Sequence, residues 1–121
     1  MGLILADTNV VIYSIKGIPA IQEYANNDFG LSDKSVIELL GVKNIDDNTL
    51  LHRNTYIDNA YVYPVTHPIR EIAIELKQKY TLKVPDAIIA ATALHYQIPL
   101  LTADKGFVRI KELTAIIISI V

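Results

Sequence analysis

Four acidic side chains lie in apolar stretches of the sequence, whereas the other nine lie among polar residues. Asp7 and Asp104 each follow a short apolar run, Glu38 lies inside one, and Asp86 opens the most apolar segment of the chain. An ionised carboxylate in dry surroundings is costly unless something pairs with it. Nearby basic residues are too few to pair all four acids, which indicates a shared role.

Four carboxylates in one cleft would repel one another and partly protonate without a cation. Oxygen ligands favour Mg²⁺ or Mn²⁺ over zinc or copper. A carboxylate-held ion lowers the pKa of a bound water, and the resulting hydroxide can attack the phosphorus of a phosphodiester. A second ion, if present, would stand roughly 3.5–4 Å away and stabilise the leaving oxygen. We expect Asp7, Asp86 and Asp104 to be metal ligands, and Glu38 to be a ligand or to orient the water.

Each acid also has an ordinary structural interpretation. Asp7 could cap the helix that follows it, Asp86 could complement a helix dipole, and Asp104 could be a turn residue. Glu38 could reach solvent from a helix edge. Singly these interpretations compete closely with the functional one, but together they require four separate explanations.

The elements around the four acids predict how they meet. Residues 3–6 and 100–102 have the composition of short buried strands. In open parallel sheets, sites form at the carboxyl ends of strands, and Asp7 and Asp104 lie just past two such ends. A helix beginning at Pro85 would place Asp86 at its N-terminus, and a helix carrying Glu38 could cross the same edge.

Strands alternate with helices along the chain. We expect helices at residues 8–16, 20–26, 33–40, 45–59, 68–80 and 85–96, and strands at residues 3–6, 29–31, 61–65, 100–102 and 115–120. Near-continuous apolar strands are typical of a parallel sheet covered on both faces. The order predicts a doubly wound α/β sandwich, with a mostly parallel twisted sheet and helices on both faces, formed by residues 1–121 as a single domain.

The amino-acid composition argues against several classes of protein and of chemical site. Hydrophobic residues make up 51% of the chain and charged residues 20%, so disorder is not expected. The absence of cysteine excludes disulfides, thiolate metal sites and Cys nucleophiles. No apolar run approaches the roughly 20 residues that a membrane span needs, and no secretory signal opens the sequence, so we expect a cytoplasmic protein away from membranes.

The net charge of −2 argues only weakly against a nucleic-acid partner. Residues 1–60 carry four basic and eight acidic side chains, whereas residues 61–121 carry seven and five. Basic side chains of the second half are therefore the candidate phosphate contacts: Lys83, Lys105, Arg109 and Lys111.

The sequence around the four acids resembles a known family. Residues 5–13, Leu-Ala-Asp-Thr-Asn-Val-Val-Ile-Tyr, resemble the opening of PIN domains, particularly VapC-type ribonuclease toxins. The family's second acid lies in a helical Glu-Leu-Leu-Gly, found here at residues 38–41. The third opens Asp-Ala-x-Ile-Ala-Ala, at residues 86–91, and the fourth lies in Thr-x-Asp-Lys-x-Phe, at residues 102–107. Each motif is short, but all four arrive in family order across nearly the whole chain.

The resemblance implies a three-layer PIN fold, one or two Mg²⁺ or Mn²⁺ ions and cleavage of RNA. The four acids become the family's acidic quartet, while Asn9 and Thr102 match polar positions that line its site. The resemblance also implies a homodimer and an antitoxin partner. Many relatives carry another acid directly before the Phe, where this chain has Gly106, which leaves the number of ions open.

Two other functions fit part of the pattern. A phosphatase would use Asp7 as an aspartyl nucleophile, but that chemistry wants a second carboxylate two residues on, where this chain has Asn9. A PIN-like binding module without metal would not need all four acids.

Overall fold

The computed structural model describes residues 2–120, and within them the chain forms one five-stranded sheet. The strand order is β3-β2-β1-β4-β5, and each neighbouring pair is parallel. The strands are β1 (Leu3–Ala6), β2 (Asp28–Ser32), β3 (Tyr61–Tyr63), β4 (Leu100–Thr102) and β5 (Ala115–Ile117). The predicted α/β class with a parallel sheet is therefore confirmed.

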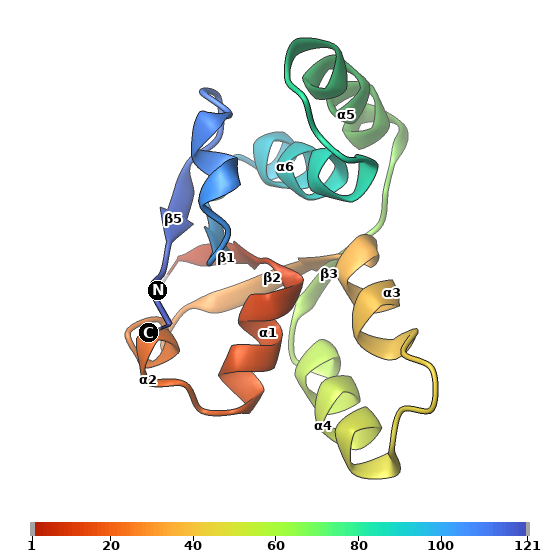
Figure 1. The fold of residues 1–121 in the computed structure, drawn as a ribbon, viewed down its shortest axis with the longest axis vertical. Coiled ribbons are helices and arrows are strands. Elements are labelled where there is room, and N and C mark those ends of the chain that lie inside the picture. Colours follow the sequence, from red (N-terminus) through yellow and green to blue (C-terminus); the bar gives the residue numbers. More distant parts are fainter. Residues whose placement is uncertain (1, 121) are drawn as a thin grey trace.

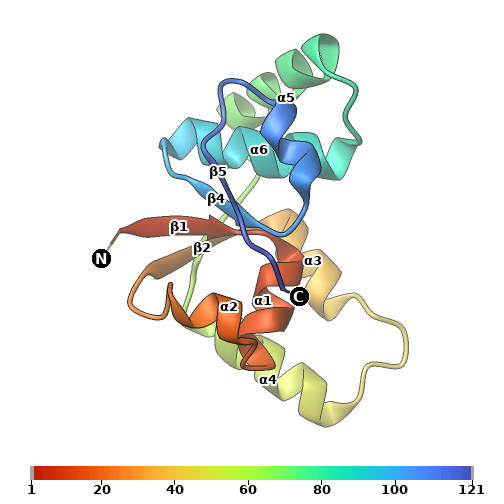
Figure 2. The same ribbon diagram turned by 60° about the vertical axis from the view of Figure 1, so that its left-hand side comes forward.

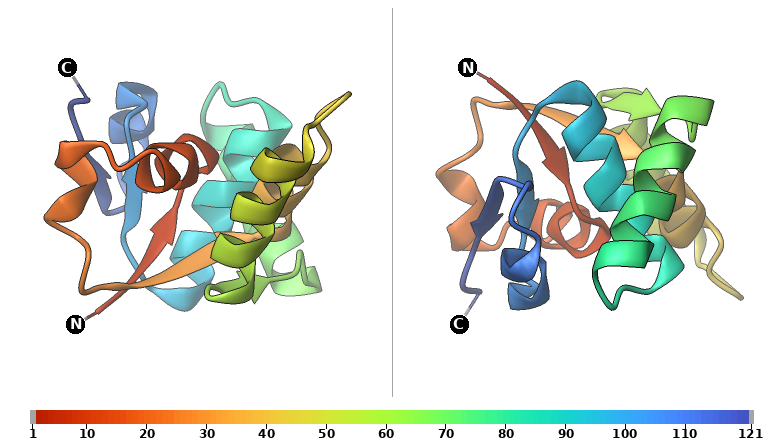
Figure 3. Two further views of the ribbon diagram at one scale, coloured as in Figure 1. Left: turned by 90° about the horizontal axis from the view of Figure 1, so that it is seen from below. Right: turned by 90° about the horizontal axis from the view of Figure 1, so that it is seen from above.

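Helices cover both faces of this sheet (Figure 1). One face carries α1 (Thr8–Ile15), α2 (Pro19–Gln22), α3 (Asp33–Leu40) and α4 (Asp47–Asp58). The other carries α5 (His67–Lys79), α6 (Val84–Tyr96) and the 3₁₀ helix η1 (Lys105–Arg109). Figure 3 shows the first group in front of the sheet from below and the second group from above.

Side-chain alternation along the strands builds two separate cores. Leu5 and Leu100 join the core beneath α5 and α6. Ile4, Ala6 and Leu101 point the other way and join the core beneath α1 and α3. Burial on both faces explains why these strands are continuously apolar.

The strand order changes direction between β1 and β4. From β1 the chain moves outward through β2 to β3, then returns by way of α5 and α6 to place β4 on the other side of β1 (Figure 2). Such a switch point leaves a crevice at the carboxyl ends of the two strands. Asp7 follows β1 there, and Asp104 lies two residues past β4.

Several elements are shorter than expected, and one was not expected. The predicted helix at residues 45–59 spans Asp47–Asp58, and the predicted strand at residues 61–65 ends at Tyr63, because its neighbour β2 ends at Ser32. The predicted helix at residues 20–26 ends at Gln22, because the chain turns there to bring Asp28 beside Leu3. The predicted strand at residues 115–120 ends at Ile117, because its neighbour β4 ends at Thr102. The helix η1 replaces a simple turn after Asp104. Within residues 2–120, no helix has the length and apolar character to cross a membrane.

Candidate active site

Asp7 is fixed at the junction of β1 and α1. Its backbone N–H donates to the Leu101 carbonyl at 3.0 Å, which ties the end of β1 to β4. Its side chain caps α1, since Oδ1 accepts from the Thr8 amide at 2.8 Å. Its other oxygen, Oδ2, accepts from the Thr102 hydroxyl at 2.8 Å. The carboxylate is thus held on both sides, and its side chain is 13% exposed.

Thr102 connects Asp7 with Asp104. Its fully buried hydroxyl donates to Asp7 and accepts from the Asp104 amide at 3.0 Å. Asp104 in turn caps η1, with Oδ1 accepting from the Gly106 amide at 2.8 Å. A Cβ at position 106 would stand 3.0 Å from that oxygen, so Gly106 leaves room for the cap. One threonine therefore sets the spacing of two acids on neighbouring strands.

Glu38 reaches the site from α3 through Thr8. The Thr8 hydroxyl lies 2.5 Å from Glu38 Oε1 and 2.9 Å from the Ser35 hydroxyl. Because a hydroxyl has one proton, Thr8 donates to the carboxylate and accepts from Ser35. Thr8 and Ser35 were not among the residues expected at the site, since isolated hydroxyl residues carry no spacing signal.

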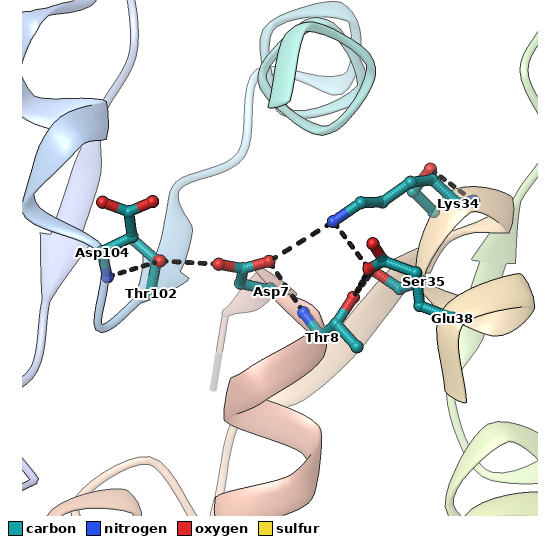
Figure 4. Close-up of polar contacts among 8 residues, drawn as sticks. Asp7, Thr8, Lys34, Ser35, Glu38, Thr102 and Asp104 are labelled. Carbon is teal, nitrogen blue, oxygen red and sulfur yellow. Dashed lines mark hydrogen bonds and ion pairs between the residues drawn. The ribbon is translucent and has the colours of Figure 1, made fainter. Parts of the chain in front are cut away.

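Lys34 is the residue that the sequence argument overlooked. Its ammonium lies 2.8 Å from Glu38 Oε1 and 3.8 Å from Asp7 Oδ1, and its side chain is 12% exposed. The sequence predicts too few nearby basic residues to pair all four acids, yet this one lysine pairs with two of them (Figure 4). The available signal was its spacing from Glu38, one helical turn away.

Asp86 joins the group from the first turn of α6. Burial raises the pKa of Asp86. The negative charges of Asp104 and Asp7 raise it further, and the positive charge of Lys34 offsets part of the rise. Asp86 also lines one small cleft together with Asp104. The pKa of Glu38 is lowered instead. Burial alone would raise it, but the hydrogen bonds from Lys34 and Thr8 and the charge of Lys34 outweigh burial.

The donor set suits a hard divalent cation, because its members are carboxylate oxygens with hydroxyls beside them. The arrangement is open, however. No three His, Cys, Asp or Glu side chains of residues 2–120 are grouped closely enough to hold an ion without adjustment. Lys34 supplies a positive charge among the acids instead.

Two clefts meet at Asp104. The larger, of about 440 Å³, is also lined by Asp7, Asn9, Tyr13 and Lys105. The smaller, of about 160 Å³, is lined by Asp86, Gly106 and Arg109 among others. Asn9 and Lys105 are exposed at the rim of the larger cleft.

The other basic candidates lie less directly on the site. Lys83 is near enough to Asp86 to lower its pKa in part. The guanidinium of Arg109 donates to the Thr81 carbonyl. The amide of Lys111 donates to the Tyr80 hydroxyl, outside the carboxylate group.

Comparison with known proteins gives consistent matches. The family model described as "PIN domain" matches residues 4–113. A protein of Rickettsia bellii named ribonuclease VapC is 31% identical, with 93% of each chain covered. A toxin–antitoxin complex from Klebsiella pneumoniae contains a chain 26% identical, with a TM-score of 0.76 and coverage of 90% of this chain and 93% of that one. VapBC2 of Rickettsia felis, solved with a promoter DNA fragment, shares the fold with a TM-score of 0.79 at 21% identity, covering 97% and 99%.

Proposed function

The chain belongs to the PIN-domain family and is VapC-like, and from that premise we propose that it is a divalent-metal-dependent endoribonuclease, the toxin of a toxin–antitoxin pair. The observation that carries the proposal is the carboxylate group at the β1–β4 switch point. There Asp7 and Asp104 share the Thr102 hydroxyl, and Asp86 lines a cleft together with Asp104. A relative that covers nearly the whole chain is named a ribonuclease, which supports RNA as the substrate.

In this proposal Asp7, Asp86 and Asp104 hold one or two Mg²⁺ or Mn²⁺ ions. The bound ion would supply hydroxide near neutral pH and stabilise charge on the phosphoryl oxygens. Thr102 keeps the Asp7 carboxylate turned toward Asp104. Glu38, held by Thr8, is either a further ligand or the group that orients the attacking water.

RNA would enter along the cleft that adjoins Asp7 and Asp104. Lys105 stands at its rim as a contact for phosphate, which holds the strand without reading its sequence. Asn9 offers an amide to the same backbone, and Tyr13 offers a ring on which a base can stack. The site would therefore take a single strand, whose bases are free to stack on an aromatic ring.

One solved neighbour is a toxin–antitoxin complex, which supports an antitoxin as the partner of this chain. We propose that the partner inhibits by placing an Arg side chain among the four carboxylates, since a guanidinium matches carboxylate oxygens in bidentate fashion. Unchanged inhibition after removal of every Arg from the partner's tail would contradict this mode.

The test of the nuclease is cleavage of end-labelled RNA with mapping of the product ends. Activity should require Mg²⁺ or Mn²⁺ and vanish with chelator, and Ca²⁺ should support little turnover because its looser shell positions water poorly. Products should carry a 3′-hydroxyl and a 5′-phosphate, because water rather than the ribose 2′-hydroxyl attacks.

Asp104→Asn should abolish cleavage. Asp46→Asn is the matched control, because Asp46 also caps a helix, α4, but lies outside the carboxylate group. A 2′,3′-cyclic phosphate, or full activity in excess chelator, would mean metal-free acid–base chemistry and overturn the proposal.

One observation favours a second candidate, a PIN-like binding module without metal. Lys34 already neutralises part of the acidic group. Isothermal titration with Mn²⁺ separates the two, since a module would show no binding and no change on Asp7→Asn.

A further inference from the structure

Lys34 is buried in a way that is unusual for a lysine. Lysines keep their ammonium in water and are rarely buried unless paired. Here 12% of the side chain is exposed, and the ammonium reaches Glu38 at 2.8 Å and Asp7 at 3.8 Å. Its charge also lowers the pKa of Asp86 in part. Two of the four acids therefore pair with this one cation.

The helix that carries Lys34 does not favour a cation at this place. Lys34 is the second residue of α3, whose N-terminus is capped by Ser32 through the Lys34 amide at 3.2 Å. The N-terminal end of a helix carries partial positive charge, which repels an ammonium. The side chain is therefore drawn across the site by the carboxylates, as Figure 4 shows where it reaches toward Asp7.

We propose that the Lys34 ammonium is an internal counter-ion, which holds Asp7 and Glu38 in the metal-free protein and competes with the divalent ion for them. The inference rests on the proposed metal-dependent function. Asp7 Oδ1 faces Lys34, and Oδ2 accepts from the Thr102 hydroxyl. A divalent ion that binds Asp7 therefore approaches a carboxylate whose two oxygens both already have partners. Metal binding requires the ammonium to withdraw from Asp7.

A purely structural ion pair predicts something different. If Lys34 only tied α3 to β1, its removal would lower stability and leave metal affinity unchanged. Competition predicts that its removal lowers stability without metal but strengthens metal binding. Stability and affinity therefore separate the two roles.

The experiment is isothermal titration of the whole chain with Mn²⁺, together with thermal melts in chelator. Lys34→Met keeps the apolar stem and removes the charge, and Lys34→Arg keeps the charge. Lys34→Met should bind Mn²⁺ at least about tenfold more tightly than the unmodified protein and should melt at a lower temperature without metal. Lys34→Arg should not tighten binding.

Lys79→Met is the matched control, because Lys79 also pairs with a carboxylate, that of Glu112 at 3.0 Å, away from the site. Its Mn²⁺ affinity should not change. Equal or weaker Mn²⁺ binding by Lys34→Met, beside clear binding by the unmodified protein, would overturn the inference and leave the nuclease proposal intact. If neither protein binds Mn²⁺, the metal-dependent function fails and the inference fails with it. Binding by Lys34→Met alone would support competition.

Discussion

A single hydroxyl governs the relative position of two of the acids. Thr102 is fully buried, and its one proton goes to the Asp7 carboxylate, which can only accept, while its oxygen accepts from the Asp104 amide. A residue that hydrogen-bonds to a metal ligand fixes the orientation of that ligand, so its loss weakens the metal site.

Thr102→Val should therefore lower RNA cleavage and Mn²⁺ affinity by about 10- to 100-fold, because valine keeps the shape but cannot hold the Asp7 carboxylate. Cleavage assays and isothermal titration measure the two losses. Thr102→Ser retains the hydroxyl and should recover most of both. Full activity in the valine variant would show that the shared hydroxyl does not set the geometry.

Asp86 predicts an unusual pH dependence of stability. Its raised pKa means that the folded protein binds this proton more tightly than the unfolded chain does. The stabilisation is present below the ordinary carboxyl pKa and is lost as pH rises through the folded-state value. Asp86→Asn is neutral throughout, so without metal it should melt at pH 7 at the same or a higher temperature than the unmodified protein.

Asp46→Asn is the comparison variant for these melts, because the pKa of Asp46 is lowered rather than raised. Hydrogen bonds from the Thr49 amide and hydroxyl lower the pKa of Asp46, so losing its charge should lower the melting temperature at pH 7. Clear destabilisation by Asp86→Asn would make Asp86 a structural residue of α6.

At the scale of elements, three of the acids stand where helices begin. Asp7 caps α1, Asp104 caps η1, and Asp86 lies in the first turn of α6. The cap and the ligand are therefore not rival interpretations of Asp7 and Asp104. Helix starts at the carboxyl edge of the sheet collect backbone N–H groups, which hold carboxylates in place before any ion arrives.

A second polar cluster lies away from the carboxylates and joins α5 to the segment after η1. The Tyr80 hydroxyl donates to Glu112 Oε1 at 2.6 Å, and the Lys79 ammonium donates to Oε2 at 3.0 Å. These bonds lower the pKa of Glu112 to about 2. The stabilisation is present above the ordinary glutamate pKa and is lost as pH falls toward 2.

Glu112→Gln should accordingly lower the melting temperature at pH 7, and the difference should disappear near pH 2. RNA cleavage at a temperature where both proteins are folded should not change. A constant difference at all pH values would mean that packing, rather than the charge of Glu112, holds this connection.

The sequence predicted most elements because their signals are local. Ser32 and Gly41 bound α3 as expected, and apolar runs marked β1 and β4. The position of Lys34 in the site was not predicted, because its burial depends on how α3 packs against the end of β1, and no local sequence pattern shows that packing. The length of α2 was not predicted for the same reason, since the helix ends where the chain turns to pair Asp28 with Leu3.

At the scale of the molecule, large apolar side chains remain exposed on α3, α4 and β3. Ile37 is 69% exposed, Leu51 62% and Tyr61 57%. Burying such side chains favours association. We expect a homodimer at micromolar concentration, to be checked by multi-angle light scattering, and a mass of one chain throughout that range would contradict it.

The hydrogen bond from Thr102 to Asp7 joins residues 95 positions apart. A ribosome makes the N-terminal residues first, so Asp7, Lys34 and Glu38 emerge well before β4 exists. During that interval Lys34 can pair with Asp7 and Glu38, but Asp104 and Thr102 have not yet been made. On the proposed function, a growing chain should therefore not cleave RNA until β4 has paired with β1 and brought Thr102 to Asp7.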